Sequence, residues 1–228
     1  MSDINYNKVC LFVKLTCLEE FGIMNKQNST GEKMSDKKDE FLQLFDTYIK
    51  RDGAAELRNF LLKSDFFTAP ASSRYHCARE GGLCEHSINT YYRLLKNIRS
   101  EYGDNWEEVV PHESVAICGL LHDLCKIDFY KLDYRNVKEN GEWVKKPWYT
   151  REETLPFGHG EKSVYIINGF MRLKRDEAMA INWHMGGFDM RARGGDGSVS
   201  EAYAIFPLAV FMHVSDLEAT YIDEKRGI

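Results

Sequence analysis

The sequence predicts an all-α fold with one small β-hairpin inserted near residues 130–149. Over most of the chain, apolar residues recur three and four positions apart, which is the periodicity of helices with one buried face. The exception is the dipeptide Asn140-Gly141, which stands between two segments of alternating character. Asn-Gly in that setting is the strongest short signal for a hairpin turn, so strands are expected there and helices elsewhere.

Length and composition restrict the class of protein. The 228 residues suffice for one large domain or a domain with an appendage. A hydrophobic content of 43% with 29% charged residues excludes a disordered or a membrane-embedded chain. The net charge of −5 argues against a dedicated nucleic-acid-coating protein, although it permits local basic patches. The six cysteines form no Cys-x-x-Cys pair, and no signal peptide or membrane-length apolar run is present. We therefore expect a cytoplasmic protein with reduced thiols and no membrane partner.

The domain boundary is predicted near residue 33. A polar linker, Asn25 to Gly31, precedes Met34-Ser35-Asp36, which resembles a natural start. Residues 1–33 are therefore interpreted as an N-terminal extension and residues 34–228 as the helical domain. Ser35 is expected to cap the first domain helix, in which Phe41, Leu44, Phe45, Tyr48 and Ile49 form the buried stripe.

The remaining elements follow from apolar spacing and from local start and stop signals. Gly53 is expected to end the first helix, Asp176 to cap a later one and Pro207 to begin the last. The helices are expected at about residues 35–52, 54–62, 83–99, 112–126, 161–171, 176–185 and from 207 onward. The glycine-rich stretch 191–198 is expected to be a mobile loop.

The predicted hairpin carries many lysines and aromatic residues. Its strands are expected at residues 134–138 and 143–146, with the Asn-Gly turn between them. Such a segment fits two interpretations, a positively charged flap in solvent or a lid over a substrate.

The most informative stretch is Gly119-Leu-Leu-His-Asp-Leu-Cys-Lys126, in which an apolar run meets three polar residues. On a helix, His122 and Asp123 lie one turn before Lys126, so all three side chains can reach one pocket. An imidazole beside a carboxylate suits a divalent cation, and a nearby ammonium suits an anionic substrate. The apolar neighbours predict burial, and a buried charged cluster needs partners or a metal.

Similar polar residues interrupt other apolar helices. Each one alone is equally compatible with a structural role, but together they provide four histidines and two carboxylates from five helices. This donor set is sufficient for two divalent metals. The members are His86, His122, Asp123, His159, His184 and Asp216.

In order and spelling, these residues resemble the HD-domain metal-dependent phosphohydrolase superfamily. Gly81-Gly-Leu-Cys-Glu-His-Ser87 resembles the first-ligand motif of that family, and Gly119 to Lys126 resembles its signature, with Cys125 where glycine is more usual. The loop Phe67 to Ala71, followed by Tyr75-His76, resembles the branch that contains the HD domain of bacterial 3'-to-5' exoribonucleases. The resemblance covers about residues 55–223 and implies an HD-domain helical bundle.

The resemblance also implies roles for individual residues. His86, His122, Asp123 and Asp216 would bind a first metal, and Asp123 would bridge to a second metal held by His159 and His184. One or two divalent ions (Fe, Mn, Ni, Co or Zn) are expected. Catalysis would rest on Asp123 and on Lys126, which would stabilise charge on the phosphoryl oxygens while a metal-activated hydroxide attacks phosphorus. The expected substrate contacts are His76, Arg79 and Lys131.

The expected substrate is a small phosphate ester, either a nucleotide, a related phosphomonoester or diester, or a short oligonucleotide. The chain lacks a recognisable OB-type nucleic-acid domain, which argues against processive RNA degradation. It also lacks the glycine-tyrosine-proline motif of cyclic-dinucleotide phosphodiesterases. Two alternatives remain open: a di-iron oxygenase of the HD-like fold, and a non-catalytic ligand-binding module that has kept its metals.

Overall fold

A computed structural model of the chain describes residues 30–224. The chain divides into two units between Ser35 and Asp36, and the account below concerns the second unit. The predicted N-terminal extension, residues 1–33, lies almost wholly outside the described residues.

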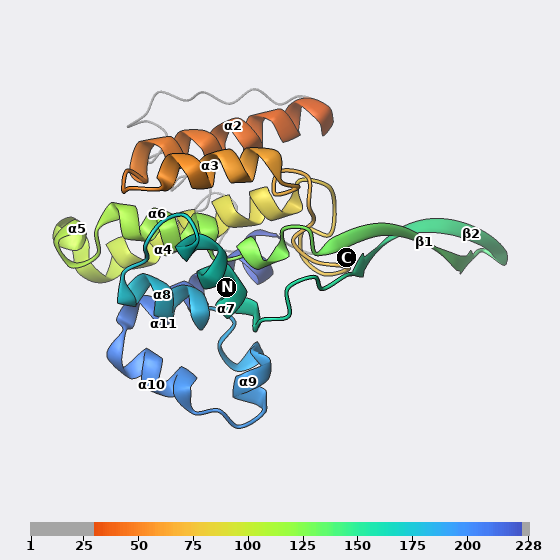
Figure 1. Ribbon diagram of the computed structural model, residues 1–228. Helices are drawn as coiled ribbons and strands as arrows, with labels where there is room; N and C mark the ends of the chain where they lie inside the picture. The colour runs from red at the N-terminus through yellow and green to blue at the C-terminus, as the bar shows by residue number, and fades with distance from the viewer. Residues whose placement is uncertain (1–29, 225–228) are drawn as a thin grey trace, which may run out of the picture. The chain divides into compact units, whose positions relative to one another are not determined.

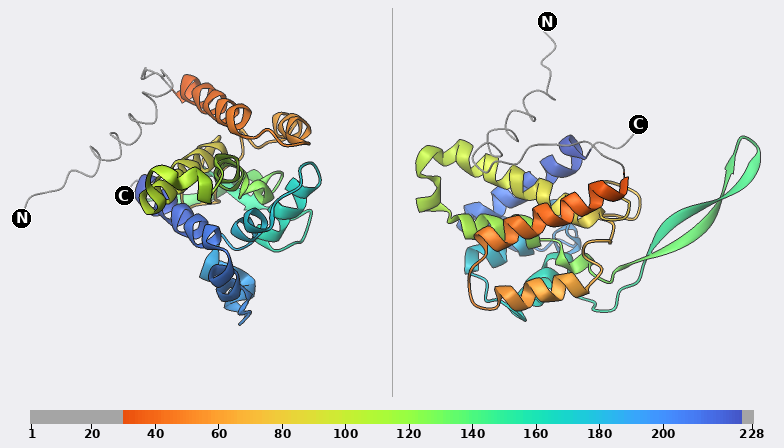
Figure 2. Two further views of the ribbon diagram at one scale, coloured as in Figure 1. Left: turned by 90° about the vertical axis from the view of Figure 1, so that its left-hand side faces the viewer. Right: turned by 90° about the horizontal axis from the view of Figure 1, so that it is seen from above.

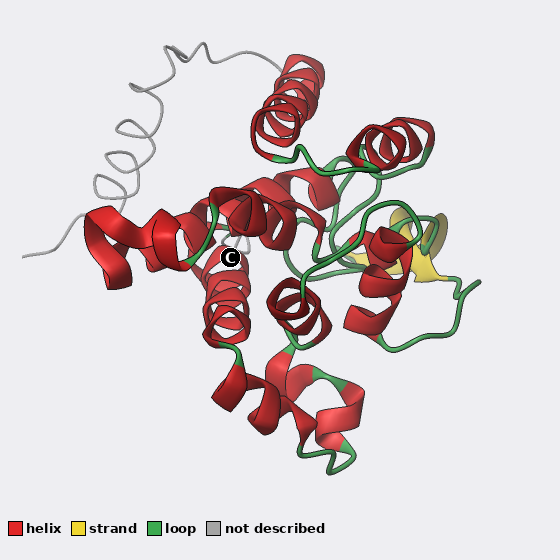
Figure 3. Cartoon of the chain, turned by 60° about the vertical axis from the view of Figure 1, so that its left-hand side comes forward, coloured by secondary structure: helices red, strands yellow, loops and turns green. Residues whose placement is uncertain are grey.

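The regular secondary structure of the described residues is helical except for one two-stranded antiparallel sheet (Figures 1 and 3). This confirms the mainly helical fold with an inserted hairpin. The α-helices are α2 (Thr30–Tyr48), α3 (Ala54–Lys63), α4 (Gly82–Tyr102), α5 (Trp106–Val109), α6 (His112–Leu121), α7 (His159–Asn168), α8 (Arg175–Asn182), α9 (Met190–Arg193), α10 (Ser198–Ile205) and α11 (Pro207–Glu218). Short 3-10 turns η1 (Gly103–Asn105), η2 (Leu124–Lys126) and η3 (Gly186–Phe188) and the π-turn η4 (Ala219–Asp223) complete the helical part, and the strands are β1 (Tyr130–Glu139) and β2 (Glu142–Arg151).

Helices α4 and α6 form the centre of the core. Helix α4 packs against both α6 and α11, and α8 packs against α6, α7 and α11. Residue Gly119 permits α6 to approach α4 closely, because a Cβ atom there would lie 2.5 Å from the Cα of Tyr91 on α4. The last turn of α6 is therefore held against α4, which brings the residue after α6, His122, towards the His86 turn of α4.

Two of the predicted helix starts are wrong. Helix α2 begins at Thr30, so Ser35 lies inside it, since Glu32, Lys33 and Met34 are good helix formers that extend the helix backwards. Helix α8 has Lys174 at its N-cap, and Asp176 is its second residue. The start is stabilised by Glu177, whose carboxylate accepts a 2.8 Å hydrogen bond from the Lys174 backbone N–H.

The predicted loop at 191–198 is confined to residues 194–197, because residues 191–193 belong to α9 and Ser198 begins α10. The guanidinium of Arg191 donates to the carboxylate of Asp189 at 2.9 Å and also pairs with Glu161. It lies over the Trp183 ring, 4.0 Å from the centroid. These contacts fix Arg191 between α7 and the end of α8, so its charge is used structurally.

The hairpin is longer than predicted and ends at Arg151 instead of about residue 149. Its register pairs Tyr130 with Arg151 at the base and Glu139 with Glu142 at the tip. Asn140 and Gly141 form the turn with φ values of 50° and 91°, the left-handed geometry that an Asn-Gly hairpin turn requires. Figure 1 and the right-hand view of Figure 2 show both strands extending away from the helices.

No single helix among residues 30–224 is long and apolar enough to cross a membrane. The pair Ser198–Ile205 and Pro207–Asp223, bent by 111°, reaches the required length and composition only when the two are counted together.

Candidate metal centre

The site is built around Asp123, at the point where α6 ends. The prediction that the central helix continues to Lys126 is wrong: α6 stops at Leu121, and Asp123 has φ −105° and ψ 21°, outside the α-helical range. The chain then makes a 3-10 turn, in which the Lys126 N–H donates to the Asp123 carbonyl at 3.0 Å. This turn still places the Lys126 ammonium 2.5 Å from Asp123 Oδ2, so the three polar residues share one pocket, as expected.

Four imidazoles surround Asp123 and divide between its two oxygens. Oδ2 lies 3.4 Å from His122 Nε2 and 3.5 Å from His86 Nε2. Oδ1 lies 2.9 Å from His159 Nε2 and 3.5 Å from His184 Nε2. A single carboxylate therefore faces two separate pairs of nitrogen donors.

Asp216, on α11, completes the first pair, because its Oδ1 is 3.1 Å from His86 Nε2. All six residues that the sequence singled out as ligands thus lie in one cluster, although they come from α4, α7, α11 and the turns that follow α6 and α8. Within the described residues, several subsets of three offer ligand atoms that lie within 4.8 Å of one another, among them His86–His122–Asp123 and His122–His184–Asp216.

Backbone carbonyls set the tautomers of two of these histidines. His122 Nδ1 lies 3.0 Å from the carbonyl oxygen of Gly119, and His184 Nδ1 lies 2.6 Å from that of Ile181. A carbonyl oxygen only accepts, so each Nδ1 carries the proton, and in the neutral ring Nε2 keeps a free lone pair. Metal-binding histidines are oriented in this way.

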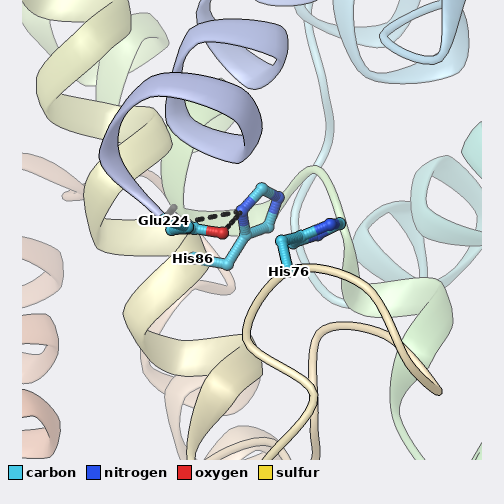
Figure 4. A group of neighbouring side chains, drawn as sticks. All are labelled: His76, His86 and Glu224. Atoms are coloured by element: carbon cyan, nitrogen blue, oxygen red, sulfur yellow. Dashed lines mark hydrogen bonds and ion pairs between the residues drawn. The ribbon is translucent and has the colours of Figure 1, made fainter. Parts of the chain in front are cut away.

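His86 receives a carboxylate in the same role. Glu224 places Oε1 at 3.0 Å and Oε2 at 3.2 Å from His86 Nδ1, and Asn89 Nδ2 donates to the same Oε1 at 3.0 Å. Figure 4 shows Glu224 and His76 on either side of the His86 ring. The sequence did not single out Glu224. The sequence signal that could have identified Glu224 is its position eight residues after Asp216, which places both residues on one side of the C-terminal helical segment.

The electrostatics of the cluster favour a cation at its centre. Burial alone would raise the pKa of Asp123, but the Lys126 ammonium and the His122 imidazole hold it well below its usual range. Burial alone would likewise lower the pKa of His86, yet the carboxylates of Glu224 and Asp216 raise it to about 10. The site is therefore rich in negative charge, and a divalent ion at Nε2 would replace the proton that these carboxylates otherwise attract.

The surroundings of one buried nitrogen atom indicate whether a metal ion fits the cluster. His184 Nε2 is buried without a hydrogen-bond partner among the described residues, while its own Nδ1 is committed to the backbone. An unsatisfied buried nitrogen is costly, and a metal would satisfy it. Four imidazole nitrogens and two carboxylates form a borderline N/O donor set, which suits Fe, Mn, Co, Ni or Zn. The residues present fit such a group.

The cluster is open on one side. The side chains of His86, His122, Asp123 and His184 are at most 2% exposed, whereas His159 is 32% exposed and Asp216 14%. His159 is the first residue of α7, and Gly160 lets that end of α7 approach α8, since a Cβ there would meet the carbonyl oxygen of Asn182 at 2.2 Å. Solvent therefore reaches the cluster beside His159.

The three expected substrate contacts lie in different places. The His76 ring lies 4.7 Å from the His86 ring, and its Nε2 is buried without a hydrogen-bond partner among residues 30–224. Arg79 instead pairs with Glu85, and Lys131 pairs with Glu152 on the hairpin. The structure therefore brings His76 to the cluster and gives the other two cations carboxylate partners outside the six cluster residues.

Cys125 is a further residue at the cluster that the sequence did not assign to it. Its Sγ lies 3.4 Å from His159 Nδ1 and 3.9 Å from Asp123 Oδ1. Burial raises the pKa of this thiol to about 12, with the Asp123 charge adding to the effect. The thiol is therefore neutral, but Asp123, Cys125 and His159 form one of the groups whose ligand atoms lie within 4.8 Å of one another.

A separate pocket of about 950 Å³ lies against α7 and α8, with Phe60, Tyr165 and Phe170 among its lining residues. None of the six cluster residues lines it. Comparisons of the chain with protein-family models, curated proteins and solved structures found no match.

Proposed function

We propose that the cluster holds two divalent metal ions and that the protein is a metal-dependent phosphohydrolase acting on a phosphate ester. The observation that carries the proposal is the division of four imidazole Nε2 atoms between the two oxygens of Asp123. A bridging carboxylate with nitrogen donors at each oxygen is the arrangement that a dinuclear centre requires. The HD-type motif spelling supports the same proposal.

In this proposal, His86, His122 and Asp216 would hold one ion, His159 and His184 would hold the other, and Asp123 would serve both. Metal ions in such a centre lower the pKa of bound water to near neutrality and polarise a phosphoryl oxygen. Glu224 fixes the ring orientation of His86, and the Gly119 and Ile181 carbonyls fix those of His122 and His184.

Lys126 is the residue that favours a phosphate over other substrates. Its side chain is only 9% exposed beside Asp123. This carboxylate raises the pKa of Lys126 above the usual range, so the ammonium is charged at neutral pH. A fixed buried cation at the centre binds the phosphoryl oxygens of an anionic substrate and stabilises their charge in the transition state. A di-iron oxygenase could use the same donor set, but it has no comparable need for this cation.

The proposal is tested by assaying the purified protein, loaded with Mn²⁺ or Fe²⁺, against bis-p-nitrophenyl phosphate and a nucleotide panel. Asp123→Ala should abolish hydrolysis, whereas the exposed control Asp104→Ala should retain the wild-type rate. Absence of hydrolysis in the loaded wild type, together with oxygen consumption on reduction, would contradict the phosphohydrolase and favour the oxygenase. Equal rates in wild type and Asp123→Ala would place the activity elsewhere.

A further inference from the structure

The β1–β2 hairpin presents both of its faces to solvent. Leu132, Tyr134 and Trp143 are exposed by 54%, 56% and 71%, which is unusual for large apolar side chains. An isolated two-stranded ribbon is only marginally stable in water, and exposed aromatic side chains on it indicate a binding surface. Ten residues per strand at about 3.4 Å each give the ribbon a reach of roughly 30 Å.

The strand register divides the hairpin into two faces of ten residues each. Directly opposed residues in an antiparallel pair share a face, and successive residues alternate between faces. The first, called here the basic-aromatic face, consists of Tyr130, Leu132, Tyr134, Asn136, Lys138, Trp143, Lys145, Pro147, Tyr149 and Arg151. The second, called the mixed face, consists of Lys131, Asp133, Arg135, Val137, Glu139, Glu142, Val144, Lys146, Trp148 and Thr150.

The two faces differ in charge. The basic-aromatic face has three cations and no carboxylate, whereas the mixed face has three cations and three carboxylates. On the mixed face the cations have partners: Lys146 pairs with Glu139, Lys131 pairs with Glu152, and Arg135 lies 3.8 Å above the centre of the Trp148 ring. By contrast, Lys138 and Lys145 of the basic-aromatic face make no ion pair with any residue in the described range 30–224.

We propose that the basic-aromatic face of the hairpin binds single-stranded nucleic acid. The exposed rings of Tyr134 and Trp143 offer stacking platforms for unpaired bases, and the partly exposed Tyr149 lies on the same face. The interleaved cations can contact the phosphates between the bases. The absence of carboxylates on this face removes the repulsion that a polyanion would otherwise meet. Because the whole chain has a net charge of −5, the unpaired cations on this face are a local feature of the hairpin.

The face leads towards the candidate metal centre. Tyr130, its first residue, is close enough to Lys126 and Asp123 for their charges to act on its phenol, whose pKa is raised chiefly by burial. A strand lying on this face would therefore have one end near the cluster. That last consequence rests on the proposed phosphohydrolase function, whereas binding to the hairpin does not depend on it.

The test measures binding without cleavage. The full-length Asp123→Ala protein is titrated into fluorescein-labelled oligo(dT) or oligo(rU), and fluorescence anisotropy is read at several salt concentrations. The variant Lys138→Ser/Lys145→Ser is compared with the matched control Arg135→Ser/Lys146→Ser, which removes the same charge from the opposite face. Trp143→Phe is added to assign any quenching of tryptophan fluorescence.

We expect the basic-aromatic variant to bind at least about tenfold more weakly than the control at low salt. Loss of two phosphate contacts should also reduce the slope of log K against log salt by about 1.4, at about 0.7 per contact. Bound oligonucleotide should quench a tryptophan signal that Trp143→Phe lacks.

Three results would overturn the proposal: no binding at low salt, equal weakening by both double variants, or equally tight binding of duplex DNA. If the protein binds no oligonucleotide but forms a dimer that Lys138→Ser/Lys145→Ser disrupts, the partner bound by this face is instead a second copy of the chain. Because binding is read on a protein lacking Asp123, failure of the phosphohydrolase proposal leaves these outcomes unchanged.

Discussion

Replacement of Glu224 should weaken metal binding although its own carboxylate lies outside the proposed ligand set. Glu224 accepts from His86 Nδ1 at 3.0 Å and from Asn89 at 3.0 Å. A hydrogen bond to a charged group contributes about 1.5–3 kcal/mol, and about 1.4 kcal/mol corresponds to a factor of ten. Glu224→Ala should therefore raise the dissociation constant of the ion at His86 by roughly 10- to 100-fold, the range found for such outer partners.

The assay is competition between the protein and a chromogenic chelator for Co²⁺ or Zn²⁺, without reference to activity. Glu224→Gln keeps an oxygen that accepts from Nδ1 but loses the charge, so its affinity should lie between those of wild type and Glu224→Ala. The matched control is Asp223→Asn, since Asp223 pairs with Arg93. Wild-type affinity in Glu224→Ala, or an equal loss in Asp223→Asn, would refute a positioning role for Glu224.

Three further predictions concern the cation, the core network and the helix contact. Lys126→Met should lower kcat by about 100-fold or more while metal content stays at the wild-type level. The control Lys162→Met, at a buried lysine outside the cluster, should leave kcat unchanged. Loss of metal in Lys126→Met would contradict the assigned role. Arg51→Met should destabilise the protein by about 3–5 kcal/mol in chemical denaturation, because it leaves fully buried Glu177 without its 2.7 Å partner. Since Arg51 lowers the pKa of Glu177 below its ordinary 4.5, this stabilisation is present above pH 4.5 and is lost as the pH falls, so the wild type and variant should converge in acid. Gly119→Ala should lower the free energy of unfolding by about 1–3 kcal/mol and weaken metal binding, since its Cβ would lie 2.5 Å from the α4 backbone. Unchanged melting temperature and metal affinity would show that the contact between α4 and α6 does not position the metal ligands.

Much of the arrangement was predictable because each ligand interrupts an otherwise apolar helix. His86, His122 and Asp216 stand out in this way, and burial of a polar group needs a compensating partner. Their convergence was expected from the motif order, and the structure brings them together. The hairpin was equally predictable, because Asn140-Gly141 has few alternatives to a tight turn.

Other features depend on tertiary contacts that local sequence does not encode. The end of α6 at Leu121 follows from the turn at Asp123, and no glycine or proline marks that position. Arg191 looked like part of a glycine-rich loop, but ion pairs with Glu161 on α7 and with the nearby N-cap residue Asp189 hold it in a helix. Glu224 was missed because a carboxylate near a chain end is usually in solvent, and its partner, His86, is 138 residues away.

The most direct test of the account is the number of metal ions bound per chain by purified, metal-loaded protein, measured by elemental analysis. A dinuclear centre should hold about two ions in the wild type, about one in His159→Ala/His184→Ala and fewer than one in Asp123→Ala, because each oxygen of Asp123 faces a separate pair of imidazoles. The same metal content in all three proteins, or no bound metal in the wild type, would contradict it.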